Sequence, residues 1–161
     1  MKNRRVFVDM DGVLADFDKR AEEILGFPWE KGNFKNWAVI TKHPNFFSEL
    51  EPMKDAFDLW EFVRPYNPII LTALPKEETL HLAEQHKEEW IRKYFGEDVE
   101  FRTGPYAMDK QSHCKPGDIL IDDNVFNIAQ WGMRSGIGIY HEDAKTSIKA
   151  IKKLAHFGIK P

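Results

Sequence analysis

Residues 4–18, RRVFVDMDGVLADFD, place aspartates at positions 9, 11, 16 and 18 around a glycine, directly after a short apolar run. An EF-hand calcium loop would need glycine at its sixth position, between two helices. Here Gly12 follows Asp9 by only three residues, and the residues before it form a predicted strand. An acidic turn in which Asp16 caps a helix is a second interpretation, but it leaves Asp9 at a strand end unexplained.

The remaining interpretation of this stretch is a catalytic carboxylate pair. A phosphate monoester is a dianion, so an attacking carboxylate needs a cation to relieve the repulsion, and Mg²⁺ prefers oxygen ligands. Asp9 would attack phosphorus and form an aspartyl-phosphate. Asp11 would protonate the leaving oxygen and later take a proton from the attacking water. Gly12 would let the backbone turn tightly beside the phosphate.

Two further polar groups stand at the ends of apolar runs. Thr72 ends the run PIILT, and Asp122 with Asp123 ends DILIDD. In a parallel sheet these ends share an edge with Asp9, and ligands bind at that edge. Asp122 and Asp123 would supply further carboxylates for a metal, and the Thr72 hydroxyl would contact a phosphate oxygen. A threonine that merely terminates a strand is an equally good interpretation of Thr72.

Lys87 interrupts the apolar face of a helix predicted over residues 76–96. The face consists of Leu80, Ala83, Trp90, Ile91 and Tyr94, so Lys87 points inward. Its stem could pack while its ammonium reaches water. Alternatively, the ammonium would lie on the transferring phosphoryl group, where preorganised positive charge favours the reaction.

Apolar runs and amphipathic stretches alternate along the chain, which predicts an α/β fold: a mostly parallel sheet with helices on both faces. The predicted strands are residues 6–10, 68–72, 99–103, 118–122 and 136–140. The predicted helices are residues 16–26, 54–64, 76–96, 124–136 and 143–158. Residues 27–52 are irregular in pattern and rich in aromatic side chains.

The composition of the chain limits the kinds of binding partner and the cellular compartment that we expect. The chain has 161 residues, which suits one domain with a small inserted subdomain, and its net charge of -3 gives no basis for binding a nucleic-acid polymer. Its single cysteine, Cys114, cannot form an internal disulfide, which favours a reducing compartment such as the cytoplasm. No apolar run is long enough for a signal peptide or a membrane span. The sequence allows a homodimer.

Four of these features together carry a family resemblance. DMDGV, Thr72, Lys87 and DILIDD match the four motifs of the haloacid dehalogenase (HAD) superfamily of phosphatases. More narrowly, DMDGVLADF, NFFSELEP, KEEWIRKYFG and DILIDD resemble segments of the 5'(3')-deoxyribonucleotidases, in the same order, over most of residues 5–124. The resemblance implies a Rossmann-like core (1–17 and 64–161) with a small helical cap (18–63) inserted after the first motif.

The resemblance also implies roles for individual residues. Mg²⁺ would be held by Asp9, the backbone carbonyl of Asp11 and Asp122, with Asp123 beside them. Asp9 would be the nucleophile and Asp11 the acid/base, and phosphate would be held by Thr72 and Lys87. The substrate would also contact Gly12 and Ala73, and its base would stack on Phe17 and on an aromatic side chain of the cap, the candidates being Trp37, Phe46 and Phe47.

The chain departs from the family pattern in three places. Ala73 and Leu74 stand where the family usually has Ser-Pro, and Asn124 stands where a basic residue is usual. The segment 102–117 is long, and Arg102 and Lys110 are its candidates for the basic residues expected there. These differences concern the substrate more than the chemistry.

The sequence therefore predicts a Mg²⁺-dependent phosphomonoester hydrolase that acts on nucleoside monophosphates, preferably deoxy forms. The first alternative is the same chemistry on another small phosphate ester, such as a sugar phosphate. The second is a non-catalytic binding domain, which the presence of both Asp9 and Asp11 disfavours.

Overall fold

A five-stranded parallel sheet with strand order β3-β2-β1-β4-β5 forms the centre of the protein. The structure is a computed structural model that describes residues 4–30, 33–76 and 80–161. The strands are β1 (Val6–Val8), β2 (Ile69–Thr72), β3 (Glu100–Thr103), β4 (Ile119–Asp122) and β5 (Ile137–Tyr140). The predicted α/β class and parallel sheet are confirmed, and each strand lies within the range expected for it.

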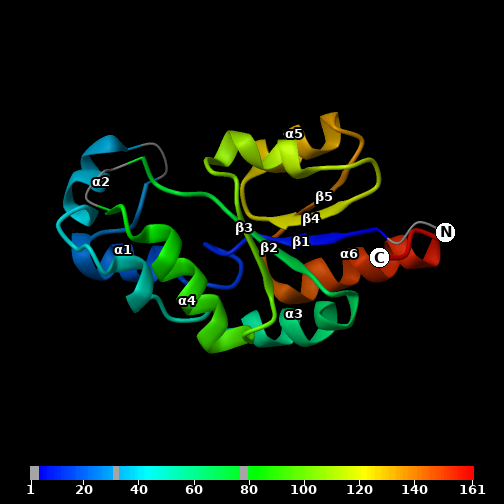
Figure 1. The fold of residues 1–161 in the computed structure, drawn as a ribbon, viewed down its shortest axis with the longest axis horizontal. Helices are drawn as coiled ribbons and strands as arrows, with labels where there is room; N and C mark the ends of the chain where they lie inside the picture. Colours follow the sequence, from blue (N-terminus) through cyan, green and yellow to red (C-terminus); the bar gives the residue numbers. More distant parts are fainter. Residues whose placement is uncertain (1–3, 31–32, 77–79) are drawn as a thin grey trace.

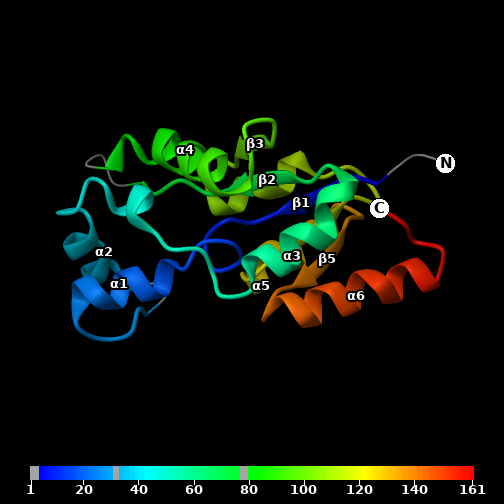
Figure 2. The same cartoon turned by 90° about the horizontal axis from the view of Figure 1, so that it is seen from below.

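Helices cover both faces of this sheet (Figure 1). The α-helices are α1 (Phe17–Leu25), α2 (Phe34–Ile40), α3 (Ala56–Val63), α4 (Ala83–Phe95), α5 (Val125–Met133) and α6 (Ala144–His156). The described residues also form the 3₁₀ helices η1 (Phe46–Glu49), η2 (Arg64–Tyr66) and η4 (Ala107–His113). In Figures 1 and 2, α5 lies on one side of the sheet and α3 and α6 lie on the other.

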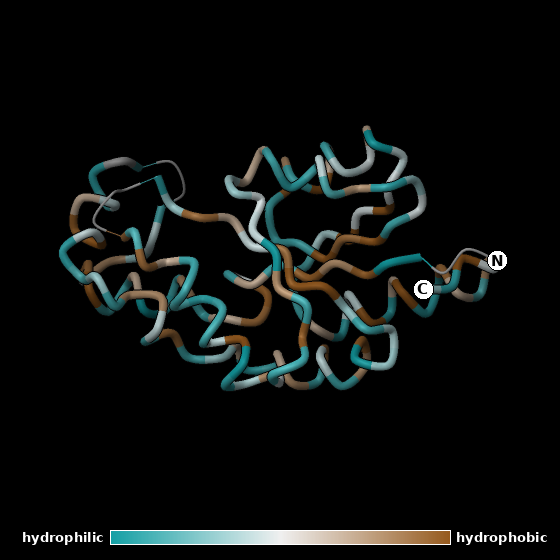
Figure 3. The backbone as a smooth tube through the Cα atoms, viewed as in Figure 1, coloured by the Kyte–Doolittle hydropathy of each residue, from teal (hydrophilic) through white to brown (hydrophobic). Residues whose placement is uncertain are grey.

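The strands are apolar on both sides, because both faces are buried. Alternate side chains of a strand point to opposite faces, and the apolar side chains accordingly form two separate clusters. One contains Phe7, Leu120 and Trp131 of α5. The other contains Val6, Val8 and many residues of the remaining helices. In the hydropathy colouring of Figure 3, the strands stand out as the apolar centre of the fold.

Helices α1 and α2 pack on one another at the end of the molecule toward which the strands run (Figures 1 and 2). Apart from Phe17, the first residue of α1, both lie in the segment 18–63 that was predicted to form a cap. Within the same segment, α3 instead contacts α6 on a face of the sheet. The division into a core and a cap with these boundaries stays a prediction.

Local signals explain where α1 begins and ends. The Asp16 side chain accepts a hydrogen bond from the backbone N–H of Lys19 (3.1 Å), and Gly26 ends the helix with a φ of 81°. The capping role considered for Asp16 is therefore confirmed. Capping explains the presence of Asp16 but not that of Asp9 or Asp11.

Two predictions of local structure were wrong. The helix expected over residues 76–96 begins only at Ala83, where no side chain caps it; residues 77–79 lie outside the described residues. Residues 27–52 are not irregular throughout, because they contain α2 and η1. Helix α2 begins where the Asn33 side chain accepts a hydrogen bond from the N–H of Lys35 (3.1 Å). This N-cap was not recognised in the sequence, because the aromatic residues around it show no regular helical pattern.

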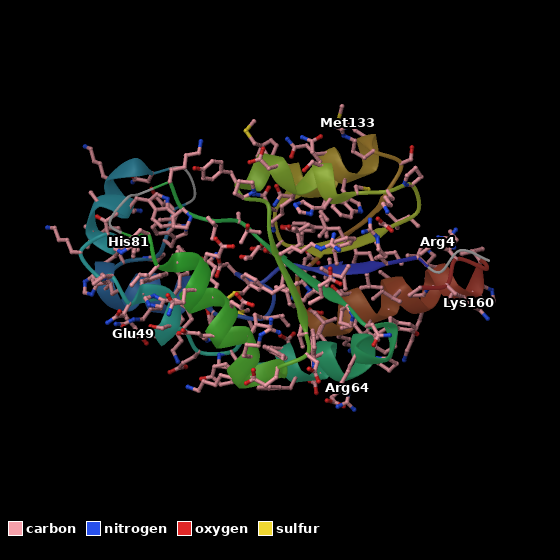
Figure 4. The ribbon with its side chains drawn as sticks, viewed as in Figure 1. Arg4, Glu49, Arg64, His81, Met133 and Lys160 are labelled. Carbon is pink, nitrogen blue, oxygen red and sulfur yellow. The ribbon has the colours of Figure 1, made fainter. Side chains whose placement is uncertain are left out.

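The outer surface is strongly charged. Figure 4 shows the exposed side chains of Glu49, Arg64 and Lys160 pointing away from the body of the protein. Within the described ranges, none of the helices combines the length and the apolar character that crossing a membrane requires.

Candidate active site

The polar residues that end the central strands meet at one edge of the sheet. Asp9 follows β1, Thr72 ends β2 and Asp122 ends β4. Strand β1 is paired with both β2 and β4, so these ends are neighbours. One carboxylate oxygen from each of Asp9, Asp122 and Asp123 lies within 4.8 Å of the others. The expected juxtaposition of the strand ends is therefore present.

The turn after Asp9 depends on Gly12. Its φ of 81° lies in the left-handed region, and a Cβ built on it would lie 2.2 Å from Oδ2 of Asp123. The Gly12 N–H donates to the carbonyl of Ala15 (2.9 Å). Glycine is thus required here both for the backbone angle and for the close approach of the two motif segments.

We expect Gly12→Ala to lose stability and activity together. The strained φ costs about 1–3 kcal/mol, and the added methyl group also displaces the Asp123 carboxylate. Gly26→Ala is the matched control, because Gly26 has the same φ of 81° and open space around its Cβ position. Chemical denaturation and a phosphatase assay measure both effects. Equal losses in the two variants would contradict the contact with Asp123.

Lys110 is the most deeply placed cation of the site. It lies on η4, is 2% exposed, and its Nζ donates to Oδ1 of Asp9 (2.7 Å) and to Oδ2 of Asp122 (2.8 Å). Burial lowers the pKa of Lys110, but the charges of Asp9 and Asp122 outweigh burial and raise it overall. Burial, reinforced by the charge of Asp122, raises the pKa of Asp9 well above its ordinary value, and Lys110 opposes this rise.

Of the two basic candidates in segment 102–117, only Lys110 reaches the site. Arg102 instead donates from Nε to Oε1 of Glu100 (2.8 Å) on the outer strand β3. The sequence could not choose between them, because the 3₁₀ turns of η4 have no amphipathic pattern that shows which side chain points inward. The choice depends on how η4 packs against β2 and α5.

Asn127 is a residue that the sequence reasoning missed. Its Nδ2 donates to Oδ2 of Asp122 (3.1 Å), and the backbone N–H of Asn124 donates to Oδ1 of the same carboxylate (2.8 Å). Asn127 is buried on the first turn of α5. A polar side chain on the inward face of an otherwise apolar helix start, five residues after Asp122, was the signal that could have identified it.

Lys87 does not reach water, so the snorkelling interpretation is wrong. The side chain is 1% exposed, and its Nζ donates to Oδ2 of Asp11 (2.7 Å), Oγ1 of Thr72 (3.0 Å) and the carbonyl of Ala73 (2.6 Å). These contacts hold the ammonium beside the predicted acid/base. If Lys87 also contacts the phosphoryl group, as expected from the sequence, that contact would have to replace one of these three hydrogen bonds.

Thr72 and Asp122 lie behind the accessible part of the site. Both side chains are fully buried, and neither is among the residues that line the cavity described below. The Thr72 hydroxyl accepts a hydrogen bond from Lys87, so the structure places it against that lysine rather than in the space that a phosphate would enter. Asp122 is oriented by Lys110, Asn124 and Asn127 instead.

A cavity of about 510 Å³ opens over Asp9, Asp11, Gly12 and Ala73. One wall of the cavity is aromatic and consists of Phe17, Trp29, Trp37 and Phe47, all but Phe17 from the segment predicted as the cap. Leu74, Pro75 and Tyr106 also line the cavity. Trp29 had not been selected from the sequence; its ring lies 5.1 Å from that of Phe17 and 5.2 Å from that of Trp37, centroid to centroid. Such edge contacts fix the aromatic wall in one arrangement.

Phe46 is a correction to the predicted base-binding set. Its side chain is fully buried, its ring packs edge-on against Phe17 and Phe47, and it does not line the cavity. Consecutive residues of the short helix η1 cannot both face the cavity, and here Phe47 does so while Phe46 supports it from behind.

The chemistry of the donor set fits a divalent metal ion. Carboxylate oxygens are the ligands that Mg²⁺ prefers, and the cluster of Asp9, Asp122 and Asp123 offers three of them. Oδ1 of Asp11 is buried and has no hydrogen-bond partner among the described residues. Four aspartates thus gather against two buried lysines, so the site has an excess of negative charge that a dication would balance.

Comparisons with known proteins agree with this architecture. Two solved structures that resemble this one are a HAD family hydrolase from Deinococcus radiodurans, crystallised with phosphate and sodium, and a hydrolase from Streptococcus pneumoniae. Their TM-scores are 0.54 and 0.51, at 12% and 11% identity. The first match covers 97% of this chain and 96% of the other, and the second covers 94% and 100%. The protein therefore has the fold of the HAD hydrolases, as the sequence predicted.

Sequence comparison narrows the resemblance. The chain is 29% identical over 126 residues to a protein of Vibrio phage KVP40 named "Putative 5'(3')-deoxyribonucleotidase", covering 76% of this chain and 67% of the relative. It is also 29% identical over 144 residues to the human mitochondrial 5'(3')-deoxyribonucleotidase, covering 74% of this chain and 61% of that protein. No protein-family model matches the chain. In sequence, the chain thus resembles the 5'(3')-deoxyribonucleotidases.

Proposed function

We propose that this protein is a Mg²⁺-dependent phosphomonoester hydrolase that dephosphorylates nucleoside monophosphates, preferably deoxy forms, through an aspartyl-phosphate. The observation that carries the proposal is a cavity in which Asp9 and Asp11 lie beneath a wall of aromatic side chains. The names of the two relatives support a nucleotide as the substrate. A cytoplasmic location and a homodimer stay predictions.

Asp9 is the proposed nucleophile. Its carboxylate is oriented by Lys110, and the backbone N–H of Asp9 donates to the carbonyl of Ile121 (2.9 Å). The carboxylate attacks phosphorus, the bond from phosphorus to the ester oxygen breaks, and the phosphoryl group remains on Asp9. The positive charge of Lys110 opposes the rise that burial causes in the pKa of Asp9, and it would stabilise the charge that develops on the phosphoryl oxygens.

Asp11 is the proposed acid and base. It gives its proton to the departing alkoxide, and it then takes a proton from the water that hydrolyses the aspartyl-phosphate. Lys87 donates to Oδ2 of Asp11 and so holds this carboxylate beside the cavity. The turn at Gly12 places Asp11 at the cavity beside Asp9.

Asp9, Asp122 and the backbone carbonyl of Asp11 would hold Mg²⁺, with Asp123 beside them. The ion would supply the positive charge that allows two anions, the Asp9 carboxylate and the phosphate, to approach each other. Asp122 is ready for this role because Lys110, Asn124 and Asn127 already fix its carboxylate.

The aromatic wall would bind the base. Phe17, Trp29, Trp37 and Phe47 present ring surfaces to the cavity, and flat bases stack on such rings. A sugar phosphate is the second candidate substrate, since the phosphate-binding edge requires no base. The aromatic lining favours the nucleotide.

A substrate panel with a metal dependence tests the proposal. We expect turnover of deoxynucleoside monophosphates with Mg²⁺, loss of turnover on adding EDTA, and recovery with excess Mg²⁺. The panel compares deoxy- and ribonucleotides, 5' and 3' forms, and sugar phosphates by kcat/KM, with phosphate release as the signal. A wide preference for sugar phosphates would overturn the nucleotidase assignment, and full activity in EDTA would overturn the metal dependence.

A further inference from the structure

We infer that Phe47 positions the acid/base Asp11 by acting through Lys87, in addition to lining the cavity. This inference rests on the proposed function, because it assumes that Asp11 protonates the leaving group. Phe47 would then be a positioning residue whose loss slows the proton-dependent step, and not only a surface on which a base stacks.

The first step of the argument is the hydrogen bonding of Lys87. A lysine ammonium has three N–H donors, and the contacts to Asp11, Thr72 and Ala73 use all three. Lys110 makes two such bonds in the described part of the chain, to Asp9 and Asp122. Lys110 therefore retains a donor for phosphate, whereas Lys87 as placed here is committed to holding Asp11.

The second step is the contact between the Lys87 ammonium and the ring of Phe47. Nζ of Lys87 lies 4.4 Å from the centroid of the Phe47 ring, within the range of a cation–π contact. Both side chains are 1% exposed. The ring thus covers the ammonium and limits the positions from which it can hold Asp11, whose own side chain is 26% exposed.

The third step is how Phe47 is itself held in place. The segment η1 packs against α4, the helix that carries Lys87. Nε1 of Trp90, also on α4, donates to the carbonyl of Leu50 (2.8 Å) just after η1. Phe46 supports the Phe47 ring from behind at 5.1 Å, centroid to centroid. The outward side chain of Glu49 in Figure 4 marks the opposite surface of the same segment.

A pair of substrates that differ only in the leaving atom tests the inference. One is a deoxynucleoside 5'-monophosphate, and the other has sulfur in place of the bridging 5' oxygen. The alkoxide needs a proton to leave, and the thiolate does not. Both carry the same base, so a loss of base binding cancels in the ratio of their kcat/KM values.

We expect Phe47→Leu to lower the oxygen-to-sulfur ratio about tenfold or more, which is part of the 10²–10⁴-fold effect of general acid catalysis. Trp37→Leu is the matched control, since it removes another ring of the cavity wall, one that packs against Phe17 and Trp29. It should leave the ratio within about twofold. Should Phe47→Leu fail to fold, Phe47→Met removes the ring at similar volume and gives the same test.

The outcomes separate the two proposals. If the wild-type protein turns over neither substrate, the proposed function is overturned, and the inference with it. Wild-type turnover of both, with an unchanged ratio in the Phe47 variants, overturns the inference alone: Phe47 then only contacts the base. An equal fall of the ratio in Trp37→Leu also overturns it, because the effect would then belong to the aromatic wall in general.

Discussion

Asp9→Asn should abolish turnover of every phosphomonoester, with a loss on the order of 10⁴-fold or more, as is typical when a nucleophile is removed. The amide keeps the shape of the side chain, but it lacks the negative charge that attacks phosphorus. The variant also loses one of the carboxylates clustered with Asp122 and Asp123. Steady-state phosphate release with saturating Mg²⁺ measures the loss.

Asp16→Asn is the matched control for this experiment. It makes the same change in the same stretch of sequence, and asparagine is as good a helix cap as aspartate. Its activity and Tm should stay close to those of the unmodified protein. Asp9→Asn that retains substantial activity while folded would contradict the assignment of Asp9 as nucleophile.

Lys110→Met should reduce both the rate and the stability. Loss of a preorganised cation at the developing charge costs on the order of 10²–10³-fold in kcat. Removing the cation also leaves Asp9 and Asp122 buried without a counter-charge, and breaking a buried pair in this way costs about 3 kcal/mol in the free energy of unfolding. Kinetics and chemical denaturation, the latter in EDTA, measure the two effects separately.

Lys115→Met serves as the control for Lys110→Met. Lys115 is exposed in the loop after η4, and in the described part of the chain it bonds through its backbone. Its N–H donates to the Asp118 carboxylate (2.8 Å), and its carbonyl accepts from the Asp118 N–H (3.0 Å). Both activity and stability should therefore be nearly unchanged. If Lys110→Met were as stable as the control, the two ion pairs of Lys110 would not contribute to the fold, and the proposed balance of charge at the site would be wrong.

Several features followed from the sequence alone, because each depends on residues close together in the chain. The apolar runs predicted the strands, since a strand buried on both faces must be apolar throughout. Asp9, Asp11 and Gly12 could be assigned from their spacing, because a strand end followed by a tight turn fixes their relative positions locally. The position of Lys87 on the apolar face of α4 showed that it points inward.

Other features were decided only by the tertiary structure. Which of Arg102 and Lys110 reaches Asp9 depends on the packing of η4, and Asn127 reaches Asp122 because α5 starts directly over the end of β4. The separation of Phe46 from Phe47, and the entry of Trp29 into the cavity wall, depend on contacts among α1, α2 and η1. In each case the local sequence is compatible with several orientations of the side chain, and long-range packing selects one.

The opening aspartates illustrate the same division. Sequence spacing separated Asp9 and Asp11 from the capping residue Asp16. Only the folded chain showed that a methyl group on Gly12 would collide with Asp123, or that Lys87 and Lys110 each hold a different one of the two aspartates. Chain connectivity determines which residues end a strand, whereas the pairing of charges across the site depends on segments that are distant in sequence and adjacent only in the fold.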